Sequence, residues 1–269
     1  MLSETGGYVI DEDETSSTTC SEAQVLVPIS PGVKQRKTSS STTVKQRQPT
    51  PSLSANQIKP LIIFDYDDTI LPTSFLNRRG LKLGGPTDDK SLEDLESVRP
   101  ILDEYSAVVN RTLTMAKRLG HVLIVTNAED RWISLTVRKY MPESANLIEQ
   151  FQHISARSMF EPTGLFTPIA WKQSAFKMVV EEYMAASATK SLVSVLPQVI
   201  SLGDSAHERE AVLKVAKDFG NRITVKSLKF MEKPDIESLK KEHLLIQECL
   251  KDIVKHVGNL DLCIQAASA

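Results

Sequence analysis

The sequence predicts an α/β protein whose strands form a mainly parallel sheet covered by helices. Three largely apolar runs, which begin at Leu61, His121 and Gln198, each end in a polar cluster. Apolar runs of this kind are typical of strands buried on both faces of a parallel sheet. Segments of helical period separate the runs. Because open α/β sheets bind ligands beyond the carboxyl ends of their strands, the polar clusters are the candidate functional residues.

The first run, Leu61-Ile62-Ile63-Phe64, leads directly into an acidic cluster of Asp65, Asp67 and Asp68. Lys59-Pro60 sets its start, since a proline keeps the preceding residue extended and cannot donate to a ladder. Asp65 and Asp67 are two residues apart, so both would lean to the same side of a continuing strand. A solvated acidic turn without a function is the alternative interpretation.

The segment from Pro72 to Pro100 is polar and contains Gly84-Gly85-Pro86. It is predicted to be a flap or loop with one short helix from Ser91. Ile101 to Leu119 then has helical periodicity, and Gly120 ends the helix.

The second run, His121 to Val125, ends in Thr126 and Asn127. The Thr126 hydroxyl could donate to a phosphoryl oxygen, and the Asn127 amide lies next to it. The alternative is that Thr126 only caps the helix that begins near Glu129.

Further elements are predicted beyond Asn127: a helix over 130–140, a short helix after Pro142, a weaker strand over 151–154 and a helix over 171–184. In the last helix Phe176, Val179 and Val180 define a buried stripe that includes Lys172, whereas Lys177 lies roughly 120° away. A lysine on the core side of a helix N-terminus needs a buried anion, which the helix end also favours. Lys172 is therefore a candidate phosphate ligand, and Lys177 is predicted to be a solvated surface residue.

The third run, Gln198 to Leu202, ends in Gly203-Asp204. Ser205 and Glu208 open a helix that runs to about Asp218 and have the spacing of a capping box. A short strand from Ile223 and a long helix over 236–257 are predicted to complete the sheet and cover one of its faces.

The motifs Asp65-x-Asp67-x-Thr69, Thr126, Lys172 and Asp204 occur in the order of the four motifs of the haloacid dehalogenase-like superfamily, which this chain resembles over about residues 58–230. The resemblance is to a eukaryotic branch without a cap domain. It implies a Rossmann-like three-layer sandwich with strand order 5-4-1-2-3 and the Asp65 strand in the centre. It also implies that Asp65 is the nucleophile, that Asp67 is a general acid and base, and that Thr126 and Lys172 bind phosphate.

The same resemblance implies a Mg²⁺ site. Asp65, Asp204 and the backbone carbonyl of Asp67 are the expected ligands, and Glu208 either joins them or only caps its helix. Elementary electrostatics agrees, because a carboxylate and an anionic phosphoryl group about 4 Å apart repel by roughly 4 kcal/mol at an effective dielectric of 20. Magnesium together with Lys172 would cancel this repulsion. Asp67 favours phosphoryl transfer over dehalogenation, since a halide leaves without a proton.

The expected function is therefore magnesium-dependent phosphohydrolysis through an aspartyl-phosphate. Neither 72–100 nor 127–171 has room for a separate cap domain, so the expected substrate is an accessible phosphomonoester of a large molecule such as a phosphoprotein. A small-metabolite phosphatase is the first alternative. A catalytically silent binding or regulatory protein of the same fold is the second. A signalling receiver domain fits less well, because its phospho-accepting Asp lies on a later strand than its acidic pair.

Composition restricts the partners and the compartment. The 269 residues have a net charge of −2, which gives no argument for nucleic acid or membrane binding. Cys20, Cys249 and Cys263 lack zinc-ligand spacing and indicate a reducing compartment, so a cytoplasmic protein is expected. Residues 1–57 are rich in Ser and Thr and predict a disordered tail. This tail either solubilises the protein or regulates it, since a kinase could read Arg36-Lys37-Thr38-Ser39, and its basic patch is also a candidate nuclear address.

Overall fold

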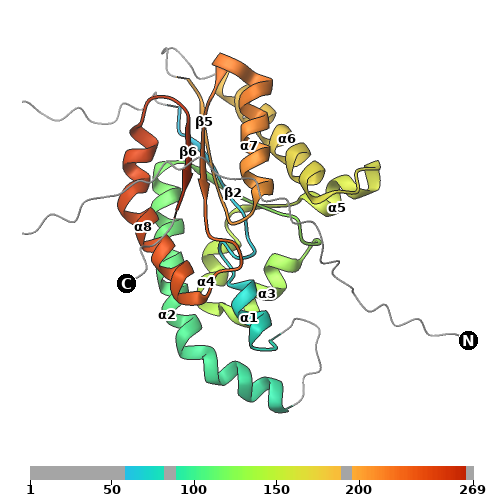
Figure 1. Ribbon diagram of the computed structural model, residues 1–269, viewed down its shortest axis with the longest axis vertical. Helices are drawn as coiled ribbons and strands as arrows, with labels where there is room; N and C mark the ends of the chain where they lie inside the picture. Colours follow the sequence, from blue (N-terminus) through green and yellow to red (C-terminus); the bar gives the residue numbers. More distant parts are fainter. Residues whose placement is uncertain (1–57, 82–88, 189–195, 265–269) are drawn as a thin grey trace, which may run out of the picture.

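A computed structural model of the chain describes residues 58–81, 89–188 and 196–264. Its centre is an open, six-stranded parallel sheet with the strand order β3-β2-β1-β4-β5-β6 (Figure 1). The strands are β1 (Leu61–Phe64), β2 (His121–Thr126), β3 (Gln152–Ser155), β4 (Gln198–Gly203), β5 (Thr224–Lys229) and β6 (Leu260–Cys263). The predicted α/β class and the parallel sheet are confirmed, and β1 lies inside the sheet between β2 and β4.

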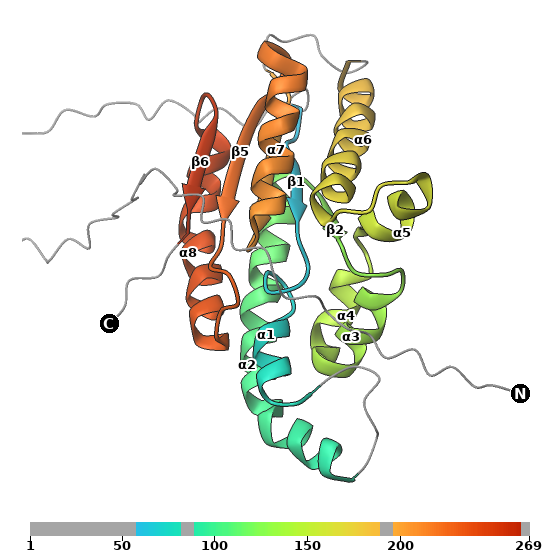
Figure 2. The ribbon, with the colours of Figure 1, turned by 45° about the vertical axis from the view of Figure 1, so that its right-hand side comes forward.

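Helices cover both faces of the sheet, which makes the fold a three-layer sandwich of the Rossmann-like type (Figures 1 and 2). The helices are α1 (Thr73–Arg78), α2 (Asp89–Leu119), α3 (Trp132–Tyr140), α4 (Pro142–Ile148), α5 (Ala156–Phe160), α6 (Pro168–Ala188), α7 (Ala206–Phe219) and α8 (Ile236–Lys255). Alternation along β1 divides the core: Ile62 and Phe64 pack with α2 and α8, whereas Leu61 and Ile63 pack with α6 and α7. No helix in the described ranges is long and apolar enough to cross a membrane.

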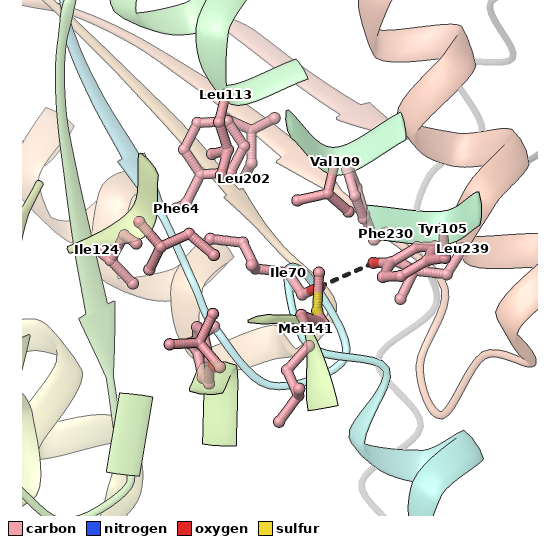
Figure 3. Packing of buried hydrophobic residues seen from close by; sticks show 14 of the residues in the cluster. Phe64, Ile70, Tyr105, Val109, Leu113, Ile124, Met141, Leu202, Phe230 and Leu239 are labelled. Carbon is pink, nitrogen blue, oxygen red and sulfur yellow. Dashed lines mark hydrogen bonds between the residues drawn. The ribbon is translucent and has the colours of Figure 1, made fainter. Parts of the chain in front are cut away.

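Two side chains on the covering helices hold the loop after β1 by hydrogen bonds. The Tyr105 hydroxyl on α2 donates to the carbonyl of Ile70 at 3.0 Å, as Figure 3 shows within the apolar core. The His243 ring on α8 donates from Nε2 to the carbonyl of Thr69 at 2.7 Å. Both side chains are completely buried. The loop that bears the acidic cluster is therefore attached to the core at two consecutive carbonyls.

The segment 72–100 was predicted to be a flap or loop with one short helix from Ser91. The helix is present as the start of α2, but the residues described after β1 are helical as well, so the flap is wrong for them. Residues 73–78 form α1, which buries Phe75 and Leu76. Arg78 then donates to the carbonyl of Pro234 at 2.6 Å, so α1 is tied to the loop before α8. The predicted boundary at Ile101 is also wrong, because α2 runs from Asp89 through Pro100.

Two other predictions have different outcomes. The helix over 236–257 is confirmed as α8, which ends at Lys255. The last strand, β6, was not predicted; it pairs with β5, and the Arg209 guanidinium on α7 forms an ion pair with Asp261 at 2.6 Å. The predicted tail of residues 1–57 lies outside the described residues.

Candidate active site

Asp65 lies where β1 ends, at the centre of the carboxyl edge of the sheet. Its backbone N–H donates to the carbonyl of Leu202 at 2.8 Å, which extends the pairing with β4 by one residue. The residue is 7% exposed. Its Oδ1 accepts a hydrogen bond from Lys172 Nζ at 2.6 Å. The predicted nucleophile is thus held at one oxygen by the predicted lysine.

Lys172 is completely buried in the first turns of α6. Its ammonium contacts Asp65 Oδ1 at 2.6 Å, Glu208 Oε1 at 2.8 Å and the carbonyl of Val125 at 2.8 Å. Burial alone would lower the pKa of Lys172, but the charges of Asp65 and Glu208 outweigh it and raise that pKa. Lys177 is exposed and at most contacts Glu181 at 4.0 Å. The predicted difference between the two lysines is confirmed.

Glu208 is the second carboxylate of this buried cluster, and protein groups occupy both of its oxygens. Oε1 contacts Lys172, while Oε2 accepts from the Ser205 N–H at 3.1 Å and the Ser205 hydroxyl at 2.5 Å. The capping box predicted from Ser205 and Glu208 is confirmed. Burial would raise the pKa of Glu208, but Lys172 and the hydrogen bonds of Ser205 hold it below its ordinary value. Glu208 therefore balances the Lys172 charge and caps α7.

Gly203 is required by the path of the Glu208 side chain. A Cβ at position 203 would lie 2.4 Å from Glu208 Cγ, far inside van der Waals contact. The Glu208 methylenes cross directly over this glycine on their way to Lys172. The Gly-Asp pair that ends β4 thus has a steric role as well as a chemical one.

Asp204 follows β4 and faces the other carboxylates. Burial and the charges of Asp65, Glu208 and Asp68 raise the pKa of Asp204 to about 9. Burial also raises the pKa of Asp65 to about 8, against the attraction of Lys172. Both shifts reflect the repulsion between carboxylates that are buried close together.

Crowded carboxylates with raised pKa values are chemically suited to a hard cation. Within the described ranges no three His, Cys, Asp or Glu side chains surround a common point as a finished metal cage. Magnesium does not need one, because it keeps several waters and takes only one or two carboxylates. Asp65, whose Oδ2 lies opposite the lysine-bound oxygen, and Asp204 fit this pattern. Glu208 fits poorly, because it would have to release Lys172 or Ser205.

Asp67 differs from Asp65 because neutral donors surround it. Its Oδ1 accepts from Thr73 Oγ1 at 2.6 Å and from Trp132 Nε1 at 2.9 Å. Its Oδ2 has one long contact, 3.4 Å from Thr126 Oγ1. Burial raises the pKa of Asp67 above its ordinary value, although the Thr73 and Trp132 hydrogen bonds pull it down. A half-buried carboxyl group with a raised pKa is suited to general acid and base work.

Asp68 has a structural role and points to α1. Its carboxylate accepts from the Ser74 N–H at 2.7 Å and from the Ser74 hydroxyl at 2.5 Å, so it satisfies the first turn of that helix. Its φ of 51° lies in the left-handed region, which Asp tolerates better than most residues. Of the acidic cluster predicted as functional, Asp68 is therefore the member that the contacts assign to the start of α1.

Thr126 and Asn127 end β2 beside Asp67. The Thr126 hydroxyl accepts from the Ala128 N–H at 2.9 Å, which leaves its proton free to donate. Asn127 Nδ2 donates to the carbonyl of Pro168 at 3.2 Å, at the start of α6. Asn127 therefore attaches the Lys172 helix to the end of β2. This bond uses one of the two N–H groups of the amide. A direct phosphate contact could therefore come from the Thr126 hydroxyl or from the second N–H of Asn127.

A cavity of about 190 Å³ opens at the carboxyl ends of β2 and β3, with Thr126 in its wall. Its lining is polar and of mixed charge: Thr126, Glu129, Asp130, Arg131, Ile133, Ser134, His153 and Ser155. Since a water molecule occupies about 30 Å³ of liquid, the cavity has room for a group the size of a small side chain.

Two residues that contact Asp67 were not predicted from the sequence. Trp132 had no assigned role in the helix predicted over 130–140, and Thr73 lay in the predicted flap. No motif marks either residue, because each reaches Asp67 only through the docking of its helix. The short polar link from Thr126 to Trp132 is the one signal that could have placed that indole near the site.

Comparison with profiles of known protein families and with curated proteins gives no match for this chain. The resemblance noted in the sequence therefore rests on the motif residues alone.

Proposed function

We propose that the protein is a magnesium-dependent phosphohydrolase of the haloacid dehalogenase-like superfamily that works through an aspartyl-phosphate. The observation that carries the proposal is the difference in surroundings between two carboxyl groups that are two residues apart. Asp65 is buried against the ammonium of Lys172, and Asp67 lies among neutral donors. These surroundings support the proposal that Asp65 is the anionic nucleophile and Asp67 the proton donor.

The chemistry follows from these placements. Asp65 attacks phosphorus, and the Lys172 ammonium stabilises the charge of the phosphoryl oxygens. As the bond from phosphorus to the leaving oxygen breaks, the Asp67 proton passes to that oxygen. Water then attacks the phosphorus of the aspartyl-phosphate and gives a proton back to Asp67, which restores both carboxyl groups. Magnesium held by Asp65 and Asp204 would supply positive charge against the repulsion between carboxylate and phosphate.

Glu208 enters this proposal as the partner of Lys172. A buried ammonium with two carboxylates stays charged, so Lys172 serves as a permanent cation and not as a proton donor. Thr126 is proposed as a phosphoryl-oxygen donor, because its hydroxyl proton has only the long contact to Asp67. Asn127 is proposed to position α6.

The experiment is hydrolysis of an aryl phosphate by purified protein with Mg²⁺ and with excess chelator. Asp65→Asn should abolish turnover with the fold intact, because an amide neither attacks phosphorus nor binds magnesium well. Asp67→Asn should retain metal binding and lose about 10²- to 10⁴-fold in rate on an alkyl phosphate, whose leaving oxygen needs a proton. Wild-type, magnesium-dependent activity in Asp65→Asn would refute the proposal. A wild-type protein without activity on any phosphomonoester would favour the silent binding protein.

The preferred substrate is an accessible phosphomonoester on a large molecule such as a phosphoprotein. One observation favours the second candidate, a small-metabolite phosphatase: the cavity of about 190 Å³ beside Thr126 could receive a compact leaving group. The two candidates share the chemistry and differ only in what surrounds the phosphate.

A further inference from the structure

The hydrogen bonds around Asp67 distinguish its two oxygens. Trp132 Nε1 and Thr73 Oγ1 both contact Oδ1, at 2.9 and 2.6 Å. An indole N–H can only donate, so Oδ1 must be an acceptor there. With the Thr73 hydroxyl as the second donor, both lone pairs of Oδ1 are used. Oδ2 has only the contact of 3.4 Å with the Thr126 hydroxyl.

We infer that Trp132 and Thr73 are positioning residues, which hold the acid by Oδ1 and place its transferable proton on Oδ2. This inference rests on the proposed function, since it concerns the acid of that reaction. A proton on Oδ1 would remove the bond that Thr73 donates and leave the Thr73 hydroxyl proton only the carbonyl of Leu71 at 3.5 Å, whereas a proton on Oδ2 changes neither bond to Oδ1. As the bond to phosphorus breaks, the leaving oxygen takes the proton from Oδ2 on the side of Thr126. Asp67 is left as a carboxylate that both donors stabilise.

The helix that supplies the indole is fixed to the acid loop from two sides. Tyr66, next to Asp67 in sequence, is completely buried, and its hydroxyl contacts Thr136 Oγ1 at 2.9 Å on α3. Trp132 reaches back from the first turn of the same helix. Arg131, directly before it, has a φ of 70°, a left-handed conformation that a residue other than glycine adopts at a cost. Backbone strain therefore lies at the residue that aims the indole.

Thr73 is held in a comparable way at the first position of α1. Asp68 accepts from Ser74 in the same turn, and Arg78 attaches the other end of the helix to Pro234. The two donors thus come from different helices, α1 and α3, each attached to the protein independently of Asp67. Donors fixed in advance need no reorganisation when the proton moves.

The first test compares leaving groups. Trp132→Phe keeps a ring and removes the N–H, and Thr73→Val keeps the shape and removes the hydroxyl. Each should slow hydrolysis of an alkyl phosphate about 10- to 100-fold, part of what a general acid contributes. Each should slow hydrolysis of nitrophenyl phosphate less than about 3-fold, because that leaving group departs without a proton. Equal losses on both substrates would overturn the inference.

The matched control is Trp171→Phe, which removes the other indole, whose N–H donates to the carbonyl of Leu165 at 2.6 Å. Any loss of rate in Trp171→Phe should be the same for the alkyl phosphate and for nitrophenyl phosphate. A double-variant cycle adds a second criterion. If Trp132 acts through Asp67, then adding Trp132→Phe to Asp67→Asn should lower the rate by a further factor of less than about 2. Additive losses would mean that the indole acts elsewhere.

A spectroscopic readout separates this inference from the proposed function. The chain has two tryptophans, so its amide NMR spectrum holds two indole N–H signals, and Trp132→Phe identifies one of them. That signal should exchange slowly with solvent and should shift in Asp67→Asn, while the Trp171 signal stays in place. An unmoved Trp132 signal would overturn the inference even in an active enzyme. A protein without phosphatase activity whose Trp132 signal shifts would refute the function and keep the hydrogen bond.

Discussion

At the scale of single residues, the centre of the site is one buried cation shared by two buried carboxylates. Lys172 has no exposed surface, and its pairing with Asp65 and Glu208 leaves none of these charges alone. Taking a charge out of water is costly, and removing one member of a buried cluster is costlier than replacing all of it. The stability of the folded protein should therefore depend most on Lys172, which lies between the two carboxylates.

Lys172→Met removes the ammonium and keeps the length of the side chain. It should lower the free energy of unfolding at pH 7 by about 3 to 5 kcal/mol, because Asp65 and Glu208 lose their shared cation. The loss should shrink as the pH falls, because burial without the Lys172 charge raises the pKa values of both acids and they become protonated in the variant. Urea unfolding across pH measures both effects, and phosphatase activity should vanish as well.

The control is Lys177→Met, five residues along the same helix. Its ammonium is exposed and comes no closer than 4.0 Å to Glu181, so the free energy of unfolding should change by less than about 0.5 kcal/mol. Similar losses in the two variants would contradict the buried arrangement.

Gly203→Ala tests the path of Glu208. The added Cβ would meet Glu208 Cγ at 2.4 Å, so the carboxylate must move away from Lys172. The expected loss in the free energy of unfolding is about 1 to 3 kcal/mol, with lower activity. In a Glu208→Ala background the same change should cost much less, since the clashing methylenes are gone. A full additional loss there would show that something other than Glu208 excludes the methyl group.

At the scale of elements, α8 is attached to the acid loop by a histidine that must stay neutral. Burial lowers the pKa of His243 to about 4 from its ordinary 6.5. Its Nε2 donates to the carbonyl of Thr69, and its Nδ1 contacts Thr112 Oγ1 at 3.2 Å. Below pH 6.5 the unfolded chain binds a proton on this residue and the folded protein does not. Stability from this group is therefore complete above pH 6.5 and falls as the pH drops toward 4.

The expected loss from His243 between pH 6.5 and 4 is about 3 kcal/mol. His243→Phe removes the titration at the cost of two hydrogen bonds. It should be less stable than wild type at pH 8, and the difference between the two proteins should narrow as the pH falls. Urea unfolding at several pH values measures this. A constant difference from pH 8 to pH 4.5 would mean that His243 does not stay neutral.

The same scale shows what the sequence could predict. Runs with one dominant period were predicted well: β1, β2, β4, α6 and the buried stripe that holds Lys172. The α2 boundary was wrong because a proline usually ends a helix at the residue before it. The apolar spacing Leu95, Val98, Leu102, Tyr105 continues through Pro100, and burial of these side chains outweighs a proline cost of about 3 kcal/mol. That spacing was visible in the sequence.

Contacts between distant segments were beyond prediction. Asp67 and Trp132 are separated by 65 residues and meet only because α3 docks on the β1 loop. Glu208 had two open interpretations, and its pairing with Lys172 depends on how α6 and α7 pack. β6 is a short edge strand that forms mainly because it pairs with β5. The periodicity of a sequence predicts its helices and strands. The contacts of individual side chains depend on how those helices and strands pack together.

At the scale of the whole molecule, nothing in the described ranges forms a separate lid over the carboxyl edge of the sheet. Between β1 and α2 lies α1, which is packed against the core. Between β2 and α6 lie α3, α4, β3 and α5, which belong to the sheet and its layers. A site without a lid cannot by itself enclose a small metabolite and exclude water. A large substrate brings its own covering surface.

The last prediction concerns the substrate that such a site prefers. Catalytic efficiency should be higher on phosphopeptides than on sugar or nucleotide monophosphates, because neighbouring residues of a peptide can extend over the edge of the sheet. Side-by-side kcat/KM values with Mg²⁺ measure this, and Asp65→Asn run in parallel corrects for contaminating phosphatases. His153→Ala provides a further comparison, since it alters the wall of the 190 Å³ cavity from β3, away from Trp132 and Asp67. A clear preference for one metabolite, lost in His153→Ala, would replace the open-site interpretation with a cavity that selects a small leaving group.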